Sequence, residues 1–117
     1  MIKFYGYKKC GTCRKAEKYL EQKNIAYEFI DITENPPNQK TLKSIADLAG
    51  VDPKKLFNTS GIQYRELKIK EKLPTLTNGE IFKMLAGNGR LIKRPLITDG
   101  ERATVGFNEA LFGETWS

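Results

Sequence analysis

The sequence of 117 residues contains no histidine and only two cysteines. The missing histidine removes the usual general base at neutral pH and the commonest metal ligand, so any chemistry must use thiols, carboxylates, amines or bound anions. The sequence also lacks low-complexity tracts, and its 39% of apolar and 29% of charged residues are typical of a folded protein. One hydrophobic core can serve a chain of this length, so we expect a single monomeric domain over residues 1–117.

Long apolar runs are missing as well. No segment is apolar for long enough to cross a bilayer, and no apolar run follows a basic start, so we expect a cytoplasmic protein without a membrane partner. The net charge is +6, but lysines and arginines are scattered along the chain and mixed with acids. Because no groove-reading or base-stacking motif accompanies this charge, we expect no direct nucleic-acid binding.

The first third of the chain has the pattern of a strand, a helix and a second strand. Residues 2–7 are rich in aromatic and branched side chains, which favours a short buried strand. Residues 14–23 place their apolar side chains at i, i+3 and i+4, which predicts a helix with one buried face. Residues 25–32 again favour a strand. Together these segments predict a right-handed β-α-β unit.

Helix signals dominate the middle of the chain, from about residue 38 to residue 88. Asn38 is placed to cap the start of a helix that Gly50 would end, and Thr77 with Glu80 matches a capping box. A helical segment is therefore expected between the N-terminal unit and the C-terminal part of the chain.

The C-terminal part predicts a β-hairpin followed by a short helix. Residues 94–98 and 103–107 are two β-prone runs on either side of a turn-forming group, and the helix would start near Asn108. The whole order of elements predicts an α/β protein with a thioredoxin-like (glutaredoxin-like) fold, a mixed sheet and a helical insertion at about residues 38–88.

Cys10 and Cys13 are separated by two residues and lie between the first strand and the first helix. Free N–H groups and the positive end of a helix dipole favour a thiolate at the start of a helix. We therefore predict that Cys10 is the nucleophile. Cys13, about one turn into the helix, would attack a sulfur adduct on Cys10 and resolve it as an intramolecular disulfide.

Three other interpretations of the cysteine pair remain open. The pair could be half of a zinc site, although the chain has no histidine and no third cysteine, so subunits would have to share the metal. The two residues could be buried structural cysteines. They could also form a structural disulfide, a bond that is rare in the cytosol.

Three motifs together resemble the ArsC/Spx family, which includes glutaredoxin-coupled arsenate reductases and Spx-type redox regulators of RNA polymerase. They are Cys-Gly-Thr-Cys-Arg-Lys-Ala at residues 10–16, Leu-Ile-Lys-Arg-Pro-Leu at 91–96 and Val-Gly-Phe-Asn-Glu at 105–109. The resemblance extends from about residue 2 to residue 112.

The resemblance implies roles for three residues. Cys10 takes the position of the nucleophile, and Arg94 that of an arginine that holds an oxyanion; a guanidinium can bind two oxygens of an arsenate or carboxylate at once. Arg94 could instead be part of an ordinary ion pair. Pro95 could follow a cis peptide bond, as the proline facing the active site does in thioredoxin-like proteins, or could mark an ordinary turn.

The sequence departs from both branches of the family. Two further arginines of the reductases align with Asn58 and Gly106, and Asp52 stands where the regulators have a glycine that contacts polymerase. The cysteine pair itself resembles that of Spx-type proteins.

Two functions are therefore expected as alternatives. The first is an arsenate reductase-like thiol–disulfide oxidoreductase that acts on a small thiol or oxyanion. It would hold no bound cofactor and would use glutathione with glutaredoxin, or thioredoxin, as external reductant. The second is an Spx-type redox sensor that binds RNA polymerase. In either case Lys8, Lys9, Arg14 and Lys15 could raise the thiolate fraction of the cysteines, or could form a solvated helix face.

Overall fold

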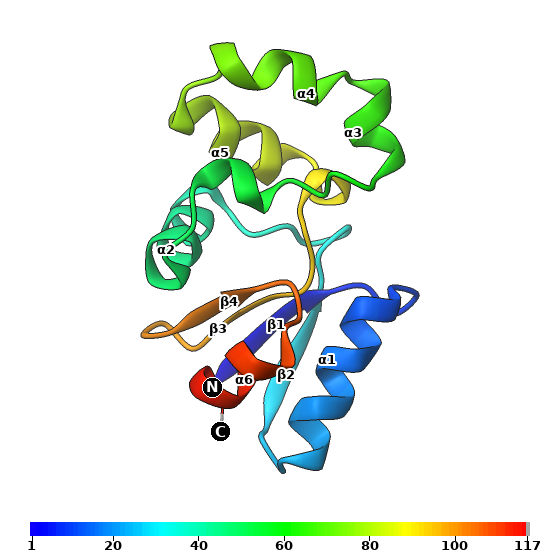
Figure 1. Cartoon of the computed structure of the whole chain (residues 1–117), viewed down its shortest axis with the longest axis vertical. Helices are drawn as coiled ribbons and strands as arrows, with labels where there is room; N and C mark the ends of the chain where they lie inside the picture. The colour runs from blue at the N-terminus through cyan, green and yellow to red at the C-terminus, as the bar shows by residue number, and fades with distance from the viewer. Residues whose placement is uncertain (117) are drawn as a thin grey trace.

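A four-stranded mixed sheet forms the middle of the computed structural model, which describes residues 1–116 (Figure 1). Its strands are β1 (Ile2–Gly6), β2 (Tyr27–Asp31), β3 (Leu96–Thr98) and β4 (Ala103–Val105), in the order β2-β1-β3-β4. β1 runs parallel to β2 and antiparallel to β3, and β3 pairs antiparallel with β4. The predicted β-α-β unit, terminal hairpin and mixed sheet are confirmed.

Helices cover both faces of this sheet, because side chains alternate between the faces along each strand. Phe4 and Ile97 are buried on one face with residues of α1 (Gly11–Gln22) and α6 (Glu109–Thr115). Tyr5 and Leu96 are buried on the other face with the central helices. In Figure 1, α1 and α6 lie below the sheet and α2 to α5 lie above it.

The central segment is helical, as predicted for residues 38–88. It contains α2 (Gln39–Ala49), η1 (Pro53–Leu56), α3 (Ile62–Glu66), α4 (Ile69–Lys72), η2 (Leu73–Thr75), α5 (Asn78–Gly87) and η3 (Gly89–Leu91). The predicted caps are present. Asn38 accepts a hydrogen bond of 2.8 Å from the backbone N–H of Thr41, and Gly50 ends α2 with a φ of 69°. Thr77 and Glu80 form the capping box of α5.

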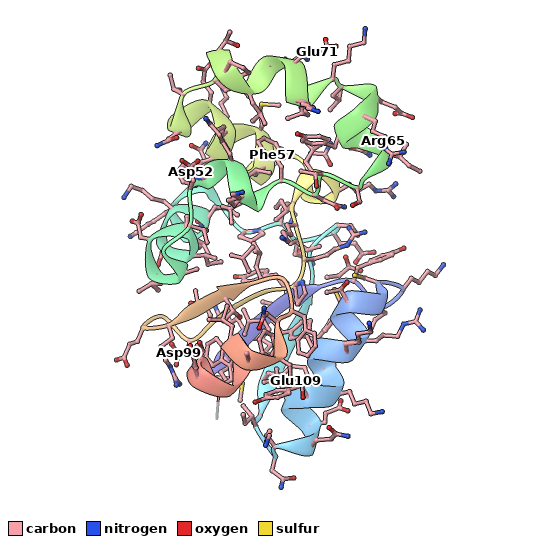
Figure 2. The ribbon with its side chains drawn as sticks, viewed as in Figure 1. Asp52, Phe57, Arg65, Glu71, Asp99 and Glu109 are labelled. Carbon is pink, nitrogen blue, oxygen red and sulfur yellow. The ribbon has the colours of Figure 1, made fainter. Side chains whose placement is uncertain are left out.

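A short antiparallel contact ties the helical segment to the chain that leads into β3. Phe57 pairs with Ile92, and the Lys93 backbone N–H donates to the Leu56 carbonyl at 2.6 Å. Phe57 points into the helical layer (Figure 2), where its ring centroid lies 5.9 Å from that of Tyr64. This contact holds the segment around residues 91–94 close to the sheet.

Gly89 lies where that segment passes the end of β2. A Cβ added to Gly89 would be 1.8 Å from the carbonyl oxygen of Ile32, which no backbone can accommodate without moving. Gly87, two residues earlier, has no atom within 4 Å of such a Cβ.

We therefore predict that Gly89→Ala lowers the free energy of unfolding by about 1–3 kcal/mol or more, because adding an atom to a tightly packed site forces the backbone to move. Gly87→Ala is the matched control, and we expect it to change stability by no more than about 1 kcal/mol. Urea unfolding followed by circular dichroism measures both. Equal stability of the two variants would contradict the close packing of Gly89 on Ile32.

Candidate functional site

The Cys10 side chain caps the N-terminus of α1. Cys10 has extended backbone angles (φ −85°, ψ 122°), and its Sγ accepts a hydrogen bond of 3.4 Å from the backbone N–H of Cys13. The sulfur thus takes the place that a serine or aspartate oxygen takes at other helix starts. Helix α1 therefore begins before the 14–23 segment that carries its apolar pattern, and both cysteines belong to its first turn.

The two thiols of this turn have opposite environments, and both are free. Burial raises the pKa of the Cys10 thiol, but hydrogen bonds from Cys13 and the guanidinium of Arg94 outweigh burial, so this pKa lies below that of an ordinary thiol. Cys13 is 0% exposed. Burial, together with the hydrogen bond and negative charge of Cys10, raises the pKa of Cys13 to about 12. The site therefore holds one partly exposed thiol whose pKa is lowered and one buried thiol whose pKa is raised.

Gly6 makes room for the buried thiol at the end of β1. A Cβ at this position would lie 2.6 Å from the Phe4 ring and 3.2 Å from the Cys13 Sγ. The absence of a side chain at Gly6 lets the first turn of α1 pack closely on the sheet.

Arg94 reaches the site from the segment before β3. Its guanidinium carbon lies 5.3 Å from the centroid of the Tyr7 ring, and its positive charge is close enough to lower the pKa of Cys10. The Arg94–Pro95 peptide bond is cis, as the resemblance suggested. The structure thus brings Cys10, Cys13 and Arg94 together from two distant parts of the sequence.

A cleft of about 940 Å³ opens beside Cys10. Its walls come from the loop before α1, from the chain around α3, from η3 with the residues that follow it, and from the turn between β4 and α6. Asn58 and Gly106, the positions at which the family resemblance led us to expect arginines, both line this cleft. Arg90 and Lys93 line it too, and the sequence analysis did not assign them to the site. The sequence feature that could have indicated them is their position within the four residues before Arg94.

The basic residues next to the cysteines in sequence do not line the cleft. The Lys8 ammonium lies 3.0 Å from the Glu17 carboxylate and 4.0 Å above the centroid of the Phe29 ring, and Arg14 donates to the Lys9 carbonyl. Lys15 is exposed on α1. Of the two interpretations offered for these residues, the solvated helix face agrees with the structure.

Residues 1–116 form neither a cluster of metal ligands nor a membrane-spanning helix. Within that range no three His, Cys, Asp or Glu side chains lie together in a way that could hold a metal ion. The same residues include no helix with the length and apolar character needed to cross a membrane.

Comparison with known proteins identifies the family. The model of the ArsC family matches residues 5–115, nearly the whole chain. The chain belongs to the ArsC family. Its thioredoxin-like α/β fold and the resemblance noted in the sequence are thereby confirmed.

Two curated proteins of different description are similar to this chain. The uncharacterized protein YusI of Bacillus subtilis is 52% identical over 116 residues, which cover 99% of this chain and 98% of YusI. The global transcriptional regulator Spx 2 of Bacillus anthracis is 28% identical over 109 residues, or 93% of this chain and 82% of the regulator.

Solved structures of ArsC-type proteins have the same fold. An ArsC family related protein from Bacteroides fragilis superposes with a TM-score of 0.93 and 42% identity, covering 97% of this chain and 95% of the other. A protein from Streptococcus mutans described as a possible arsenate reductase gives a TM-score of 0.85 and 40% identity, covering 92% of each chain.

The lowered pKa of Cys10 leads to a prediction about its reactivity. Because the thiolate is the nucleophile, the alkylation rate of Cys10 with iodoacetamide should reach half its maximum at a lower pH than that of an ordinary thiol. Arg94→Met should move this midpoint to higher pH, since a favourable charge beside the thiolate is lost. Cys13 should alkylate far more slowly, because it is buried and protonated. Peptide mass spectrometry over a series of pH values separates the two thiols.

Lys15→Met is the control, because Lys15 is exposed on the same helix and lies outside the cleft. We expect its midpoint to equal that of the wild type. A shift as large as that of Arg94→Met would mean that general surface charge, rather than Arg94, sets the pKa of Cys10.

Proposed function

We propose that this ArsC-family protein is a thiol–disulfide oxidoreductase of the arsenate reductase type, with Cys10 as nucleophile, Cys13 as resolving thiol and Arg94 as anion holder. The observation that supports it most is the difference between the two thiols of one helix turn. Cys10 is partly exposed with a lowered pKa, whereas Cys13 is buried with a pKa of about 12. In such a pair, the Cys10 sulfur can attack an acceptor first, and the Cys13 sulfur can react in a later step.

The first step is attack by the Cys10 thiolate on an acceptor bound in the cleft. With arsenate, a bond forms between sulfur and arsenic, and one arsenic–oxygen bond breaks as a protonated oxygen leaves as water. Arg94 lies beside the reacting sulfur, where its guanidinium can hold two oxygens of the acceptor and balance their charge. The helix N-terminus adds its own preference for an anion.

The second step uses Cys13. The charge of Cys10 and its hydrogen bond with Cys13 help to raise the pKa of Cys13, and both are lost once the Cys10 sulfur is bonded to the acceptor. Burial, the largest cause of the raised pKa, remains, but the loss of the Cys10 charge lowers the pKa of Cys13. Cys13 then loses its proton as its sulfur attacks the Cys10 sulfur. The sulfur–arsenic bond breaks with its electron pair left on arsenic, so arsenite leaves and a Cys10–Cys13 disulfide remains. Two electrons have passed from two thiols to the acceptor.

An external thiol must then reduce the disulfide to restore the starting state. Cys10 lies at the cleft and is partly exposed, whereas Cys13 is fully buried. We propose that thioredoxin, or glutathione with glutaredoxin, attacks the Cys10 sulfur and releases Cys13 as the thiol. No bound cofactor is needed for either half of the cycle.

The test is consumption of thiols that depends on an acceptor. Reduced protein would be supplied with arsenate, or in parallel with the small uncharged disulfide of 2-mercaptoethanol, and with thioredoxin, thioredoxin reductase and NADPH. We predict NADPH oxidation faster than the background reaction of thioredoxin with the acceptor, and this excess should be lost in Cys10→Ser. With arsenate as acceptor, Cys13→Ser should lose turnover with thioredoxin alone and recover part of it when glutathione, glutaredoxin and glutathione reductase are added, because an external thiol then replaces the resolving one.

Failure of both acceptors would contradict the enzymatic role. If the wild type consumes no NADPH beyond the Cys10→Ser background with arsenate or with the disulfide, the protein is not an oxidoreductase of this type.

A redox sensor of the Spx type is the second candidate, and the 28% identity with Spx 2 favours it. In this role, oxidation of Cys10 and Cys13 would change the surface that RNA polymerase recognises. Asp52, which takes the place of a polymerase-contacting glycine in the regulators, caps η1 and lies away from the start of α1 (Figure 2). Retention of RNA polymerase on the immobilised oxidised protein, but not on the reduced one, would support this candidate. Equal background retention of polymerase on both would argue against it.

A further inference from the structure

The charged side chains that line the cleft are all positive. Arg90, Lys93 and Arg94 line it, and no aspartate or glutamate does so among residues 1–116. The part of the chain described by the structure contains no ion pair to any of the three cations. Asp31 accepts hydrogen bonds from the Thr33 side chain and backbone, and its carboxylate is close enough to Arg94 for the two charges to interact. The Arg94 charge is therefore partly balanced, and the cleft as a whole offers an excess of positive charge to whatever enters it.

Apolar side chains form another part of the same cleft. Ile62 at the start of α3 is 74% exposed, and Leu111 on α6 is 43% exposed. Both line the cleft, as does Phe107, whose ring is supported by Phe112 at 4.7 Å between centroids. A tetrahedral oxyanion cannot use such side chains, because it has no apolar group to bury against them.

The size and polar groups of the cleft also differ from those of a simple oxyanion site. A volume of about 940 Å³ is at the upper end of the range for pockets that enclose whole organic ligands, about 300–1,000 Å³. The two wall positions that align with additional arginines of the reductases are Asn58 and Gly106, so charge directly around the Cys10 sulfur comes from Arg94 alone. Arg90 and Lys93 extend the charge along the cleft.

We propose that the acceptor of this protein is a disulfide of an acidic peptide, in which a cysteine is flanked by carboxylate side chains and an apolar residue. This inference rests on the proposed function, since it names the substrate class of the same Cys10 site. The peptide sulfur would meet Cys10, its carboxylates would lie near Arg90 and Lys93, and its apolar side chain would pack on Ile62 and Leu111.

The reaction is a pair of thiol–disulfide exchanges. The Cys10 thiolate attacks the peptide sulfur, a new disulfide forms between Cys10 and the peptide, and the original partner leaves as a thiolate. Cys13 then attacks the Cys10 sulfur, which releases the peptide thiolate and leaves the Cys10–Cys13 disulfide. The peptide disulfide gains two electrons and takes up protons from solvent, while the two protein thiols are oxidised.

The experiment uses two five-residue peptides, acetyl-Glu-Leu-Cys-Glu-Gly-amide and its Lys-Leu-Cys-Lys counterpart, each as a mixed disulfide with thionitrobenzoate. Thionitrobenzoate is the better leaving group, so each attack on the peptide sulfur releases one coloured thiolate. We predict that the acidic peptide reacts between about 2-fold and 30-fold faster, the range that two exposed ion pairs allow. The ratio should fall toward 1 in 0.5 M NaCl, which screens exposed charges.

Variants test whether residues of the cleft cause the faster reaction of the acidic peptide. The double variant Arg90→Gln/Lys93→Gln should react with both peptides at similar rates, whereas Lys15→Gln, an exposed charge outside the cleft, should keep the full preference. Ile62→Ser should slow the acidic peptide by about 2-fold or more, and this loss should vanish when the peptide leucine is replaced by serine.

The outcomes separate this inference from the proposed function. Release of thionitrobenzoate that requires Cys10 but has the same rate for both peptides would overturn the inference and leave the oxidoreductase proposal standing. A preference that survives in the Arg90→Gln/Lys93→Gln variant would also overturn it. Release that is unchanged in Cys10→Ser would contradict both.

Discussion

The hydrogen bond from the backbone N–H of Cys13 to the Cys10 sulfur is the contact on which the site depends. It makes the sulfur the cap of α1, so the same interaction that starts the helix also favours the charged form of the nucleophile. Cys13 is carried into the core by the same turn, between α1 and the sheet, where Gly6 leaves space for its sulfur. One turn of helix thereby holds both a partly exposed thiol of lowered pKa and a buried thiol of raised pKa.

The helical segment forms the wall of the cleft that faces the first turn of α1. Pairing of Phe57 with Ile92 and burial of Phe57 against Tyr64 hold the chain that ends in Arg94. The residues around α3 then face the start of α1 across the cleft. Without this segment, the cysteines would lie beyond the end of β1 with no wall of a cleft opposite them. Membership of the ArsC family describes the scaffold, and a shared scaffold does not by itself determine activity.

Much of the fold and the reactive pair could be predicted from the sequence, because both depend on local signals. Strand and helix periodicity, the caps at Asn38 and Thr77 and the spacing of Cys10 and Cys13 are each encoded within a few residues. Arg94 required the resemblance to the family. Arg90 and Lys93 were missed, because no local pattern in the sequence shows that the chain before β3 lines the cleft. Lys8 shows the reverse case: it is two residues from Cys10 in sequence, but Glu17 and Phe29 hold it elsewhere.

The measurement that tests this account most directly is the redox equilibrium of the cysteine pair. The protein would be equilibrated in dithiothreitol buffers of defined potential, quenched with acid and an alkylating agent, and mapped by mass spectrometry of its peptides. The account predicts a reversible Cys10–Cys13 disulfide that forms in a single two-electron step and is absent in Cys10→Ser and in Cys13→Ser. Two thiols that stay free across oxidising buffers, or that become capped independently of one another, would contradict it.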